Sequence, residues 1–502
     1  MTIPDESRTP PDDTQHDGAP APDLVARAAE VAPKPRQLAW QQQELTAFVH
    51  FTVNTFTDRE WGDGTESPRI FNPTDCDPEQ WARVLKQAGF KTLILTAKHH
   101  DGFCLWPSRH TDHTIAHSPY RDGNGDLVRE TVEACRKAGL RFGVYLSPWD
   151  RHDERYGTER YNEFYLAQLH ELLTGYGDVH QLWLDGAKGD DAADMAYDWG
   201  EIFRTARSLQ PGIVIKEAGD PQAGYVFEEP GTDLPDIRWV GNENGFARES
   251  EWSVIPVQGP ALAVDARASD LGSRAKLKGA RRLLWWPAEA DVSIRPGWFH
   301  HDSENERLKS LGELLDIYYR SVGSNAVLLL NVPPDRRGLL HESDVKRLRQ
   351  FRKAREQTFA SDLAAKATVQ PDCPAAAGLA ARHLVDPDPQ TFWTPAEDQT
   401  CPTIDIILPA EARFDRVLLQ EKITYGQRIE AFEVHIDSGG DWQCLATGTT
   451  IGYKKLLRTR AAQTRRVRIL IREARAAPVL SRVALFKCGP LEASASTSDG
   501  TA

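Results

Sequence analysis

Short apolar segments alternate with amphipathic helical segments from about residue 40 to residue 355, and this alternation constrains the fold more than any other feature. Apolar runs expected to form strands lie at 45–51, 91–97, 140–147, 179–185, 213–216, 237–240, 282–286 and 326–331. Strands separated by helices pair in parallel, and eight such units close into a barrel. We therefore predict an α/β fold in which residues 38–360 form a (β/α)8-like, TIM-type barrel.

Capping residues indicate where several of the intervening helices begin and end. The predicted helix 78–88 follows Asp77, begins with Pro78 and precedes Gly89, and the predicted helix 126–138 precedes Gly139. Helices are also expected at 161–173 and at 342–355. Residues 219–236 are rich in Gly and Pro and lack a helical pattern, so we expect an irregular barrel around its fifth and sixth strands.

The sequence pattern changes after residue 360. Short β-type segments at 403–408, 414–419, 432–436 and 466–471 are separated by turn residues and show no helical period. This pattern predicts an all-β, antiparallel sandwich over residues 361–488. Residues 1–37 and 489–502 are rich in small and polar residues, and both are expected to be disordered, as a leader and a tail.

Composition excludes several classes of function. The net charge of −13 argues against binding to nucleic acid or to an anionic membrane surface. No apolar run approaches the roughly 20 residues of a membrane span, and the N-terminus lacks the pattern of a signal peptide. The seven cysteines form no C-x-x-C pair, which favours reduced thiols and a cytoplasmic location.

Two carboxylates follow predicted strands. Asp185 ends the apolar run that contains Trp183, and Glu243 follows the run that contains Trp239. The carboxyl ends of the strands of such a barrel meet at one mouth, so the two side chains are expected to converge. Glycoside hydrolysis with retention uses two carboxyl groups about 5–5.5 Å apart. The structural alternative is that Asp185 caps the following loop and Glu243 is solvated.

Histidines and tryptophans lie near the same strand ends. His99 and His100 end the second predicted strand, and His50 ends the first. Neutral imidazoles suit hydrogen bonds to sugar hydroxyls, and the many tryptophans suit stacking on sugar C–H faces. Two adjacent histidines without a third ligand at metal spacing are a weak zinc signal. A metal-dependent barrel hydrolase using His99, His100 and Asp185 nevertheless stays open.

Taken together, several segments resemble the α-L-fucosidases of glycoside hydrolase family 29. They are FVHF at 48–51, NTF at 54–56, EWGDG at 60–64, TAKHHDGF at 96–103, GVYLSPW at 143–149, WLDGA at 183–187 and RPGWF at 295–299. The resemblance covers about residues 38–360, and the segments occur in family order. It implies a retaining exo-α-L-fucosidase that acts without a metal or organic cofactor, with a fucosylated oligosaccharide as substrate.

The resemblance also implies roles for individual residues. Asp185 corresponds to the family nucleophile. The segments GNE at 241–243 and SEWS at 250–253 resemble the branch that prefers α-1,3/1,4-linked fucose, in which Glu243 is the acid/base. Fucose contacts are implied at His50, Glu60, Trp61, His99, His100, Tyr145, Trp183 and Trp298, with Arg248 as a further possible contact. LVD at 384–386 and TFWT at 391–394 resemble a discoidin-like sandwich, expected to support the barrel rather than bind sugar.

Some alternatives remain at this point. The Gly/Pro-rich insertion between Asp185 and Glu243 holds three other glutamates, Glu217, Glu228 and Glu229. A non-catalytic glycan-binding protein is the second alternative to the hydrolase. The natural glycan and the oligomeric state do not follow from the sequence.

Overall fold

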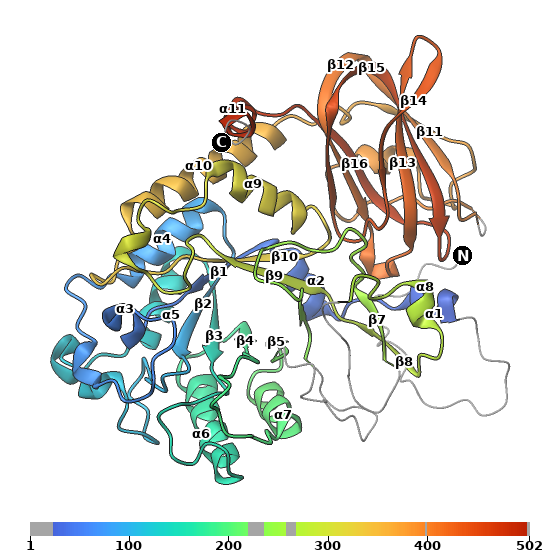
Figure 1. Cartoon of the computed structure of the whole chain (residues 1–502). Coiled ribbons are helices and arrows are strands. Elements are labelled where there is room, and N and C mark those ends of the chain that lie inside the picture. Colours follow the sequence, from blue (N-terminus) through green and yellow to red (C-terminus); the bar gives the residue numbers. More distant parts are fainter. Residues whose placement is uncertain (1–23, 219–234, 258–267, 397–398, 499–502) are drawn as a thin grey trace, which may run out of the picture.

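The computed structural model describes residues 24–218, 235–257, 268–396 and 399–498. Its centre is a parallel sheet in the order β5-β4-β3-β2-β1-β10-β9-β6 (Figure 1). A parallel bridge between Lys216 and Ile237 joins the two ends of this sheet and closes the ring. The predicted barrel is therefore confirmed. Its strands are β1 (Leu45–Val49), β2 (Thr92–Lys98), β3 (Arg141–Leu146), β4 (Gln181–Trp183), β5 (Val214–Lys216), β6 (Arg238–Trp239), β9 (Ala288–Ser293) and β10 (Val327–Asn331).

The seventh barrel strand differs from the prediction. Segment 282–286 was expected in the barrel, but β8 (Arg282–Trp285) pairs antiparallel with β7 (Val254–Val257) in a separate hairpin. The barrel strand is β9, which pairs with β10 and β6. Its sequence, AEADVS, alternates small or apolar residues with Glu289, Asp291 and Ser293. The prediction of the more apolar segment 282–286 as the seventh barrel strand was wrong, because the interior of this barrel holds carboxyl groups from β9.

Helices of the barrel lie outside the sheet (Figure 1). In α4 the Asp77 carboxylate caps the first turn by accepting from Gln80 N at 3.0 Å, and Gly89 ends the helix at φ 98°. Gly139 ends α5 in the same left-handed conformation, as expected for glycine at this position. The larger helices are α4 (Pro78–Ala88), α5 (Leu127–Ala138), α6 (Arg160–Gly175), α7 (Trp199–Leu209), α9 (Leu311–Arg320) and α10 (Glu342–Phe359).

Irregular structure surrounds the fifth and sixth strands, as predicted. Strand β6 has two residues, and the described part between β6 and β9 holds the β7–β8 hairpin and the short helix α8 (Arg274–Leu277). Residues 219–234 of the Gly/Pro-rich insertion, which include Glu228 and Glu229, lie outside the described residues. The remaining short elements near the barrel are α3 (Val53–Thr57), η1 (Pro68–Ile70), η2 (Ile115–His117), η3 (Tyr120–Gly123) and η4 (Asp302–Glu304).

Both chain ends carry helices where disorder was expected. Helix α1 (Leu24–Glu30) lies within the predicted leader and α2 (Pro35–Gln41) begins in it. Ala28 of α1 packs in one cluster with Val254 and Trp285 of the hairpin. Helix α11 (Pro490–Ser498) lies within the predicted tail. Its buried Glu492 accepts hydrogen bonds from Arg416 at 2.6 Å and from Thr358 at 2.7 Å. Tertiary contacts order these segments despite their weak sequence patterns. No helix within the described ranges is long and apolar enough to span a bilayer.

The C-terminal domain is an antiparallel β-sandwich built around two long strands (Figure 1). Strand β12 pairs with β15 along its length, with β11 near its start and with β16 near its end. Register shifts between β12 and β15 follow Ile407 and Phe414, and such bulges bend a strand. Predicted strands 403–408 and 414–419 therefore belong to one continuous bent strand. The elements are β11 (Thr368–Pro371), η5 (Ala381–Val385), β12 (Thr403–Glu421), η6 (Ile423–Tyr425), β13 (Ile429–Ser438), β14 (Asp441–Gly448), β15 (Lys455–Ala474) and β16 (Leu480–Phe486).

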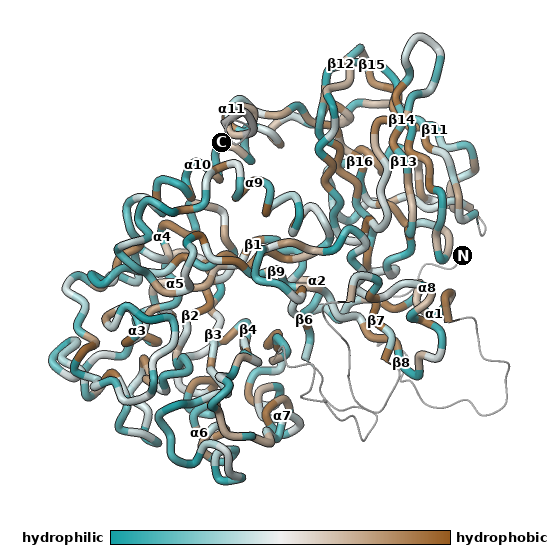
Figure 2. The backbone as a smooth tube through the Cα atoms, viewed as in Figure 1, coloured by the Kyte–Doolittle hydropathy of each residue, from teal (hydrophilic) through white to brown (hydrophobic). Residues whose placement is uncertain are grey.

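The sandwich packs directly against the barrel. Leu418, Leu456 and Phe486 from the sandwich belong to the same buried cluster as the barrel helices. Asn325 accepts a hydrogen bond from Tyr453 N at 2.8 Å and donates one to Glu251 O at 3.0 Å. Apolar residues follow the strands of both domains, whereas polar residues dominate the outer loops (Figure 2). The shared core fixes the position of β15 relative to the strand ends of the barrel.

Candidate active site

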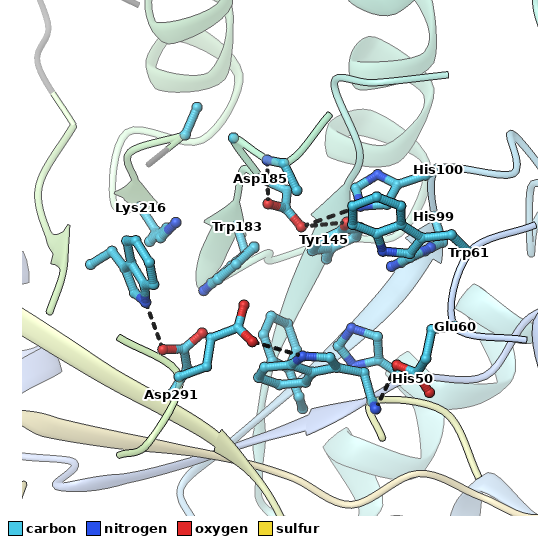
Figure 3. Close-up of a pocket in the computed structure, with 17 residues that line it drawn as sticks. His50, Glu60, Trp61, His99, His100, Tyr145, Trp183, Asp185, Lys216 and Asp291 are labelled. Atoms are coloured by element: carbon cyan, nitrogen blue, oxygen red, sulfur yellow. Dashed lines mark hydrogen bonds and ion pairs between the residues drawn. The ribbon is translucent and has the colours of Figure 1, made fainter. Parts of the chain in front are cut away.

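A cavity of about 520 Å³ lies at the carboxyl ends of the barrel strands (Figure 3). Ten of the eleven residues proposed from the sequence as catalytic or substrate-contacting line it, all but Arg248: His50, Glu60, Trp61, His99, His100, Tyr145, Trp183, Asp185, Glu243 and Trp298. They come from strand ends or the loops that follow β1, β2, β3, β4, β6 and β9. The expected convergence of Asp185 and Glu243 on one cavity is therefore present.

Asp185 lies two residues after Trp183, the buried end of β4, and meets several hydrogen-bond donors. Its Oδ2 accepts from the Tyr145 hydroxyl at 2.9 Å and its Oδ1 from Ala187 N at 2.9 Å, while His100 Nε2 lies 3.7 Å from Oδ2. Burial alone would raise the pKa of Asp185, but His100 in its protonated form, Lys216 and these two donors hold it below its usual value. The group is therefore kept as a carboxylate.

Three histidines line the cavity as neutral rings. Burial lowers the pKa of His50 and of His100 to about 4 each, and the pKa of His99 falls well below its usual value for the same reason. The Ser147 hydroxyl donates to Trp149 O at 2.6 Å and so accepts from His100 Nδ1 at 2.7 Å. Nε2 of His100 is then an acceptor beside Asp185, which suits a ligand hydroxyl that donates a hydrogen bond.

His50 is oriented in a comparable way. The amide nitrogen of Asn331 donates to Trp298 O at 2.7 Å and to Ser293 Oγ at 3.0 Å, so its oxygen accepts from His50 Nδ1 at 2.8 Å. The Nε2 atom of His50 is left as a hydrogen-bond acceptor. His50 and His100 therefore both present an acceptor Nε2 atom to a ligand.

Glu243 lies on an exposed loop after β6 and meets a different environment. The indole Nε1 of Trp298 donates to its Oε2 at 3.3 Å. Burial raises the pKa of Glu243, the nearby charges of Asp185 and Glu60 raise it further, and the Trp298 hydrogen bond and Lys216 oppose the shift without cancelling it. Glu243 therefore retains its proton to a higher pH than an ordinary glutamate.

Glu60 holds the loop that carries Trp298. Its carboxylate oxygens accept from Trp298 N at 2.8 Å and Phe299 N at 3.2 Å. His301 Nε2 lies 2.7 Å from Glu60 Oε1. Trp61 beside it is 46% exposed and packs edge-on against His100 and Trp149. Glu60 thus positions one wall, and Trp61 offers an indole surface at the mouth.

Aromatic rings form a continuous wall inside the cavity. Tyr145 stacks on Trp183 with centroids 5.3 Å apart, and Phe48 contacts Trp183 and Trp298 edge-on. Glu289 accepts from the Trp183 indole at 2.7 Å and fixes this ring. The wall supplies an apolar surface opposite the polar groups.

Two charged lining residues were missed from the sequence. Lys216, at the end of β5, places its ammonium 3.9 Å from the Trp183 ring centroid and donates to Leu184 O at 3.2 Å. Asp291 accepts from the Trp239 indole at 2.7 Å, and burial raises the pKa of its carboxyl to about 8. Both residues belong to strands, and the alternation AEADVS was the one available signal for Asp291.

Two other polar residues from the sequence analysis do not line the cavity. Arg248 donates to Ala268 O at 2.7 Å and pairs with Glu251 at 3.2 Å. Glu217 is buried and accepts from Trp239 N at 2.5 Å. These contacts explain both residues as parts of the frame that holds β6.

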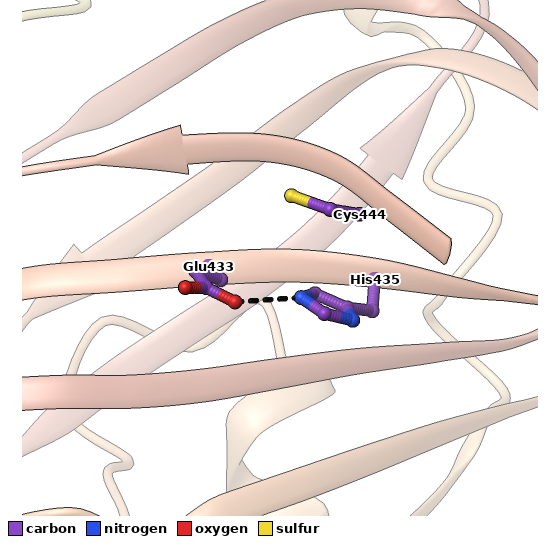
Figure 4. A group of neighbouring side chains, drawn as sticks. All are labelled: Glu433, His435 and Cys444. Atoms are coloured by element: carbon purple, nitrogen blue, oxygen red, sulfur yellow. Dashed lines mark hydrogen bonds and ion pairs between the residues drawn. The ribbon is translucent and has the colours of Figure 1, made fainter. Parts of the chain in front are cut away.

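The trio expected for a metal-dependent hydrolase does not converge. Within the described ranges, one group brings three ligand atoms within 4.8 Å of one another, and it is Glu433, His435 and Cys444 in the sandwich (Figure 4). His99, His100 and Asp185 do not meet this criterion. Glu433 in that trio is already held by Arg472 at 2.7 Å. The geometry of the cavity therefore favours chemistry by carboxyl groups.

Comparisons with known proteins agree with this geometry. A family model described as alpha-L-fucosidase matches residues 30–236. Alpha-L-fucosidase 1 of Arabidopsis thaliana is 40% identical over 462 residues, covering 90% of this chain and 87% of the relative. A protein of Oryza sativa subsp. japonica named as an alpha-L-fucosidase 1 is 41% identical over 475 residues, covering 93% of this chain and 87% of that protein.

A solved structure supports the same assignment along nearly the whole chain. The Ruminococcus gnavus GH29 fucosidase in complex with fucose superimposes with a TM-score of 0.80 at 32% identity, covering 95% of this chain and 98% of that one. The chain belongs to the α-L-fucosidase family of glycoside hydrolases.

Proposed function

We propose that the protein is a retaining exo-α-L-fucosidase that removes α-1,3/1,4-linked L-fucose from branched oligosaccharides. One observation carries the proposal: a single cavity holds a carboxyl group kept ionised, Asp185, and a carboxyl group kept protonated to higher pH, Glu243. Two carboxyl groups with pKa values pushed apart are the requirement for acid-assisted displacement at a sugar.

In the first step, Asp185 attacks the anomeric carbon of fucose while Glu243 gives its proton to the glycosidic oxygen. The bond between C1 and that oxygen breaks, the leaving sugar departs as an alcohol, and fucose is held as an ester of Asp185. In the second step, Glu243 takes a proton from water, which attacks C1 and releases Asp185. The α-configuration is restored because C1 is inverted twice.

The remaining lining residues suit fucose recognition. His50 and His100 each offer an acceptor nitrogen to sugar hydroxyls, and His99 stacks parallel to Tyr145 at 5.6 Å. The aromatic wall of Phe48, Trp183 and Trp298 suits the C5 methyl group of fucose. The chemistry uses groups of this chain alone, so treatment with a strong chelator should leave the rate unchanged.

The linkage preference rests on sequence. The segments 241–243 and 250–253 resemble the branch that acts on α-1,3/1,4-linked fucose. The segments 384–386 and 391–394 resemble a discoidin-like sandwich, which we expect to support the barrel.

Product analysis tests the proposal. The protein is incubated with Lewis-type trisaccharides, an α-1,2-fucosylated trisaccharide and an aryl α-L-fucoside, and released fucose is followed by NMR. We expect release from the Lewis-type and aryl substrates, with α-fucose as the first anomer observed. β-Fucose as the first product would contradict retention. Binding of the trisaccharides without any release would support the non-catalytic alternative, and faster release from the α-1,2 substrate would contradict the linkage assignment.

A further inference from the structure

The hairpin of β13 and β14 carries three potential metal ligands on one face. Strand β14 is the last strand in the sheet order β11-β12-β15-β13-β14. Val434 and Ile436 of β13 are buried in the core of the sandwich. Because side chains alternate along a strand, Glu433 and His435 lie on the outer face. Cys444 of β14 is exposed and pairs in register with His435, so a carboxylate, an imidazole and a thiol share this face (Figure 4).

A register shift in the hairpin places Cys444 opposite His435. Val434 pairs with Ala446 and His435 pairs with Cys444, so Leu445 is the extra residue on β14. Such bulges change the direction in which neighbouring side chains point. Regular pairing continued from Val434 and Ala446 would put Leu445 opposite His435, but Leu445 packs against the core of the sandwich. The bulge therefore supplies the outer face with a thiol at the position nearest to the imidazole.

The three ligand atoms are close enough for one metal ion. A carboxylate oxygen of Glu433, a ring nitrogen of His435 and Sγ of Cys444 lie within 4.8 Å of one another. Zinc binds oxygen and nitrogen at about 2.0–2.2 Å and sulfur at about 2.3 Å, so the ligand atoms of a tetrahedral site lie about 3.3–3.6 Å apart. Side-chain rotations that shorten the longest separation by about 1–1.5 Å complete such a site. His435 Nε2 and Glu433 Oε2 already lie 2.7 Å apart.

The donor types favour Zn²⁺ over other common cations. Ca²⁺ and Mg²⁺ take oxygen ligands, and the trio supplies one carboxylate. Zn²⁺ accepts thiolate, imidazole and carboxylate, and three protein ligands leave its fourth position for water. Cys444 is exposed, so water reaches this position. On binding, the thiol of Cys444 releases its proton to solvent and His435 binds as the neutral ring.

Arg472 of β15 leaves part of the Glu433 carboxylate available. Its Nη2 donates to Glu433 Oε2 at 2.7 Å, and no described residue donates to Oε1. A carboxylate offers about four lone-pair positions, so Glu433 can keep Arg472 and still bind a metal. Hydrogen bonds from Arg472 and His435 lower the pKa of Glu433 to about 2, so the ligand is ionised at neutral pH. Arg472 then orients the carboxylate from outside, as hydrogen-bonded partners of metal ligands commonly do.

We propose that Glu433, His435 and Cys444 form a Zn²⁺ site that joins the edge strand β14 to β13. None of the three lines the catalytic cavity, so this metal takes no part in hydrolysis. A ligand that binds the folded chain and not the unfolded chain raises the free energy of unfolding. The function of the site is therefore to stabilise the edge of the sandwich.

Metal titration of the full chain, without an affinity tag, tests the site. The protein is stripped with a chelator, dialysed, kept reduced with a non-thiol reductant and titrated with Zn²⁺ by calorimetry. The variants are His435→Gln and Cys444→Ser. The matched controls are Cys401→Ser, at an exposed cysteine of the sandwich outside the trio, and His170→Gln, at an exposed histidine of α6.

We expect wild type and both controls to bind one equivalent of Zn²⁺. Loss of an outer partner of a metal ligand commonly weakens binding by about 10–100-fold, so loss of a ligand itself should weaken it at least tenfold. Co²⁺ should give a thiolate charge-transfer band in wild type and in Cys401→Ser, and no such band in Cys444→Ser. Unchanged affinity in either variant would overturn the proposal. So would the absence of saturable binding to wild type, or loss of the band in Cys401→Ser.

Thermal melting tests the structural role of the metal. A small excess of Zn²⁺ should raise the Tm of wild type and of both controls, and leave the Tm of Cys444→Ser unchanged. Without metal, Cys444→Ser should melt at the wild-type temperature, which shows that the variant folds. Binding to wild type without a rise in Tm would overturn the stabilising role. A chelator should leave the wild-type rate on an aryl fucoside within twofold, and a larger loss would place the metal in the catalytic cavity instead.

Discussion

The two walls of the catalytic cavity shift the pKa of a carboxyl group in opposite directions. The wall built by β2, β3 and β4 surrounds Asp185 with His100, the Tyr145 hydroxyl and the Ala187 N–H. The wall built by β6 and β9 gives Glu243 a single indole donor and places it near other carboxyl groups. Burial raises the pKa of both groups, yet only that of Glu243 ends above its usual value.

This difference shows that donors and nearby charge, rather than burial alone, determine which carboxyl group keeps its proton. The trend extends behind Glu243, where burial raises the pKa of Glu289 to about 7 and that of Asp291 to about 8. One wall therefore stabilises an anion, and the other retains protons. A nucleophile and a proton donor require these two environments.

Asp185→Asn removes the anion from the first wall and should have the largest effect. The amide has nearly the same shape but cannot form the ester, so kcat should fall about 10⁴-fold or more. Steady-state kinetics on an aryl fucoside measure the loss. Asp190→Asn, on the exposed part of the same loop, is the control and should retain wild-type rates. Activity of Asp185→Asn within tenfold of wild type would refute its assignment as the nucleophile.

Glu243→Gln removes the proposed proton donor from the second wall. Rates on a trisaccharide should fall by about 10²–10⁴, the usual contribution of general acid catalysis. An aryl fucoside with a good leaving group should lose less in its first step, because that leaving group departs without a proton. Glu249→Gln, exposed on the same loop, is the control. If Asp291→Asn rather than Glu243→Gln shows this dependence on the leaving group, the acid is Asp291.

The sequence predicted the first wall more completely than the second. Strands β1 to β4 are apolar runs that end close to polar residues. The apolar runs predicted the strands, and the position of the polar residues at the strand ends predicted His50, His99, His100 and Asp185 as site residues. Glu60 and Trp298 lie in loops, which carry no comparable pattern, and the family resemblance supplied them.

The sequence pattern did not identify the β9 residues of the second wall, and the reason is physical. Strand β9 turns Glu289 and Asp291 toward the interior of the barrel, where indole donors satisfy them. A strand with carboxyl groups on its inner face does not look buried, so the apolar run of the hairpin was preferred. Helix α11 escaped prediction for a related reason, since its ordering depends on the distant Arg416 rather than on its own sequence.

Lys216→Met tests the positive charge that lowers the pKa of both Asp185 and Glu243. The wild-type kcat/KM should rise with pH as Asp185 ionises and fall as Glu243 loses its proton, with the falling limb moved up by the raised pKa of Glu243. Lys216 lowers the pKa of both groups, so its removal should move both limbs to higher pH. The maximal rate should fall by about tenfold or more, because the substitution also removes the hydrogen bond from the charged Lys216 ammonium to Leu184 O, worth about 1.5–3 kcal/mol. Lys188→Met, exposed on the loop after β4, is the control, and limbs that move in opposite directions would contradict this account.

Trp298→Phe should have the smallest effect and acts on the second wall alone. The ring stays beside His50, and Trp298 N still bonds Glu60, but Glu243 loses its indole donor. Because that donor lowers the pKa of Glu243, the falling limb of the pH profile should move to higher pH while the rising limb stays in place. A neutral hydrogen bond contributes about 1 kcal/mol, so the rate at the optimum should change by no more than about fivefold. Trp442→Phe in the sandwich controls for loss of an indole. A shift of the rising limb would show that Trp298 also affects the pKa of Asp185. That result would contradict the view that the two walls set the two pKa values independently.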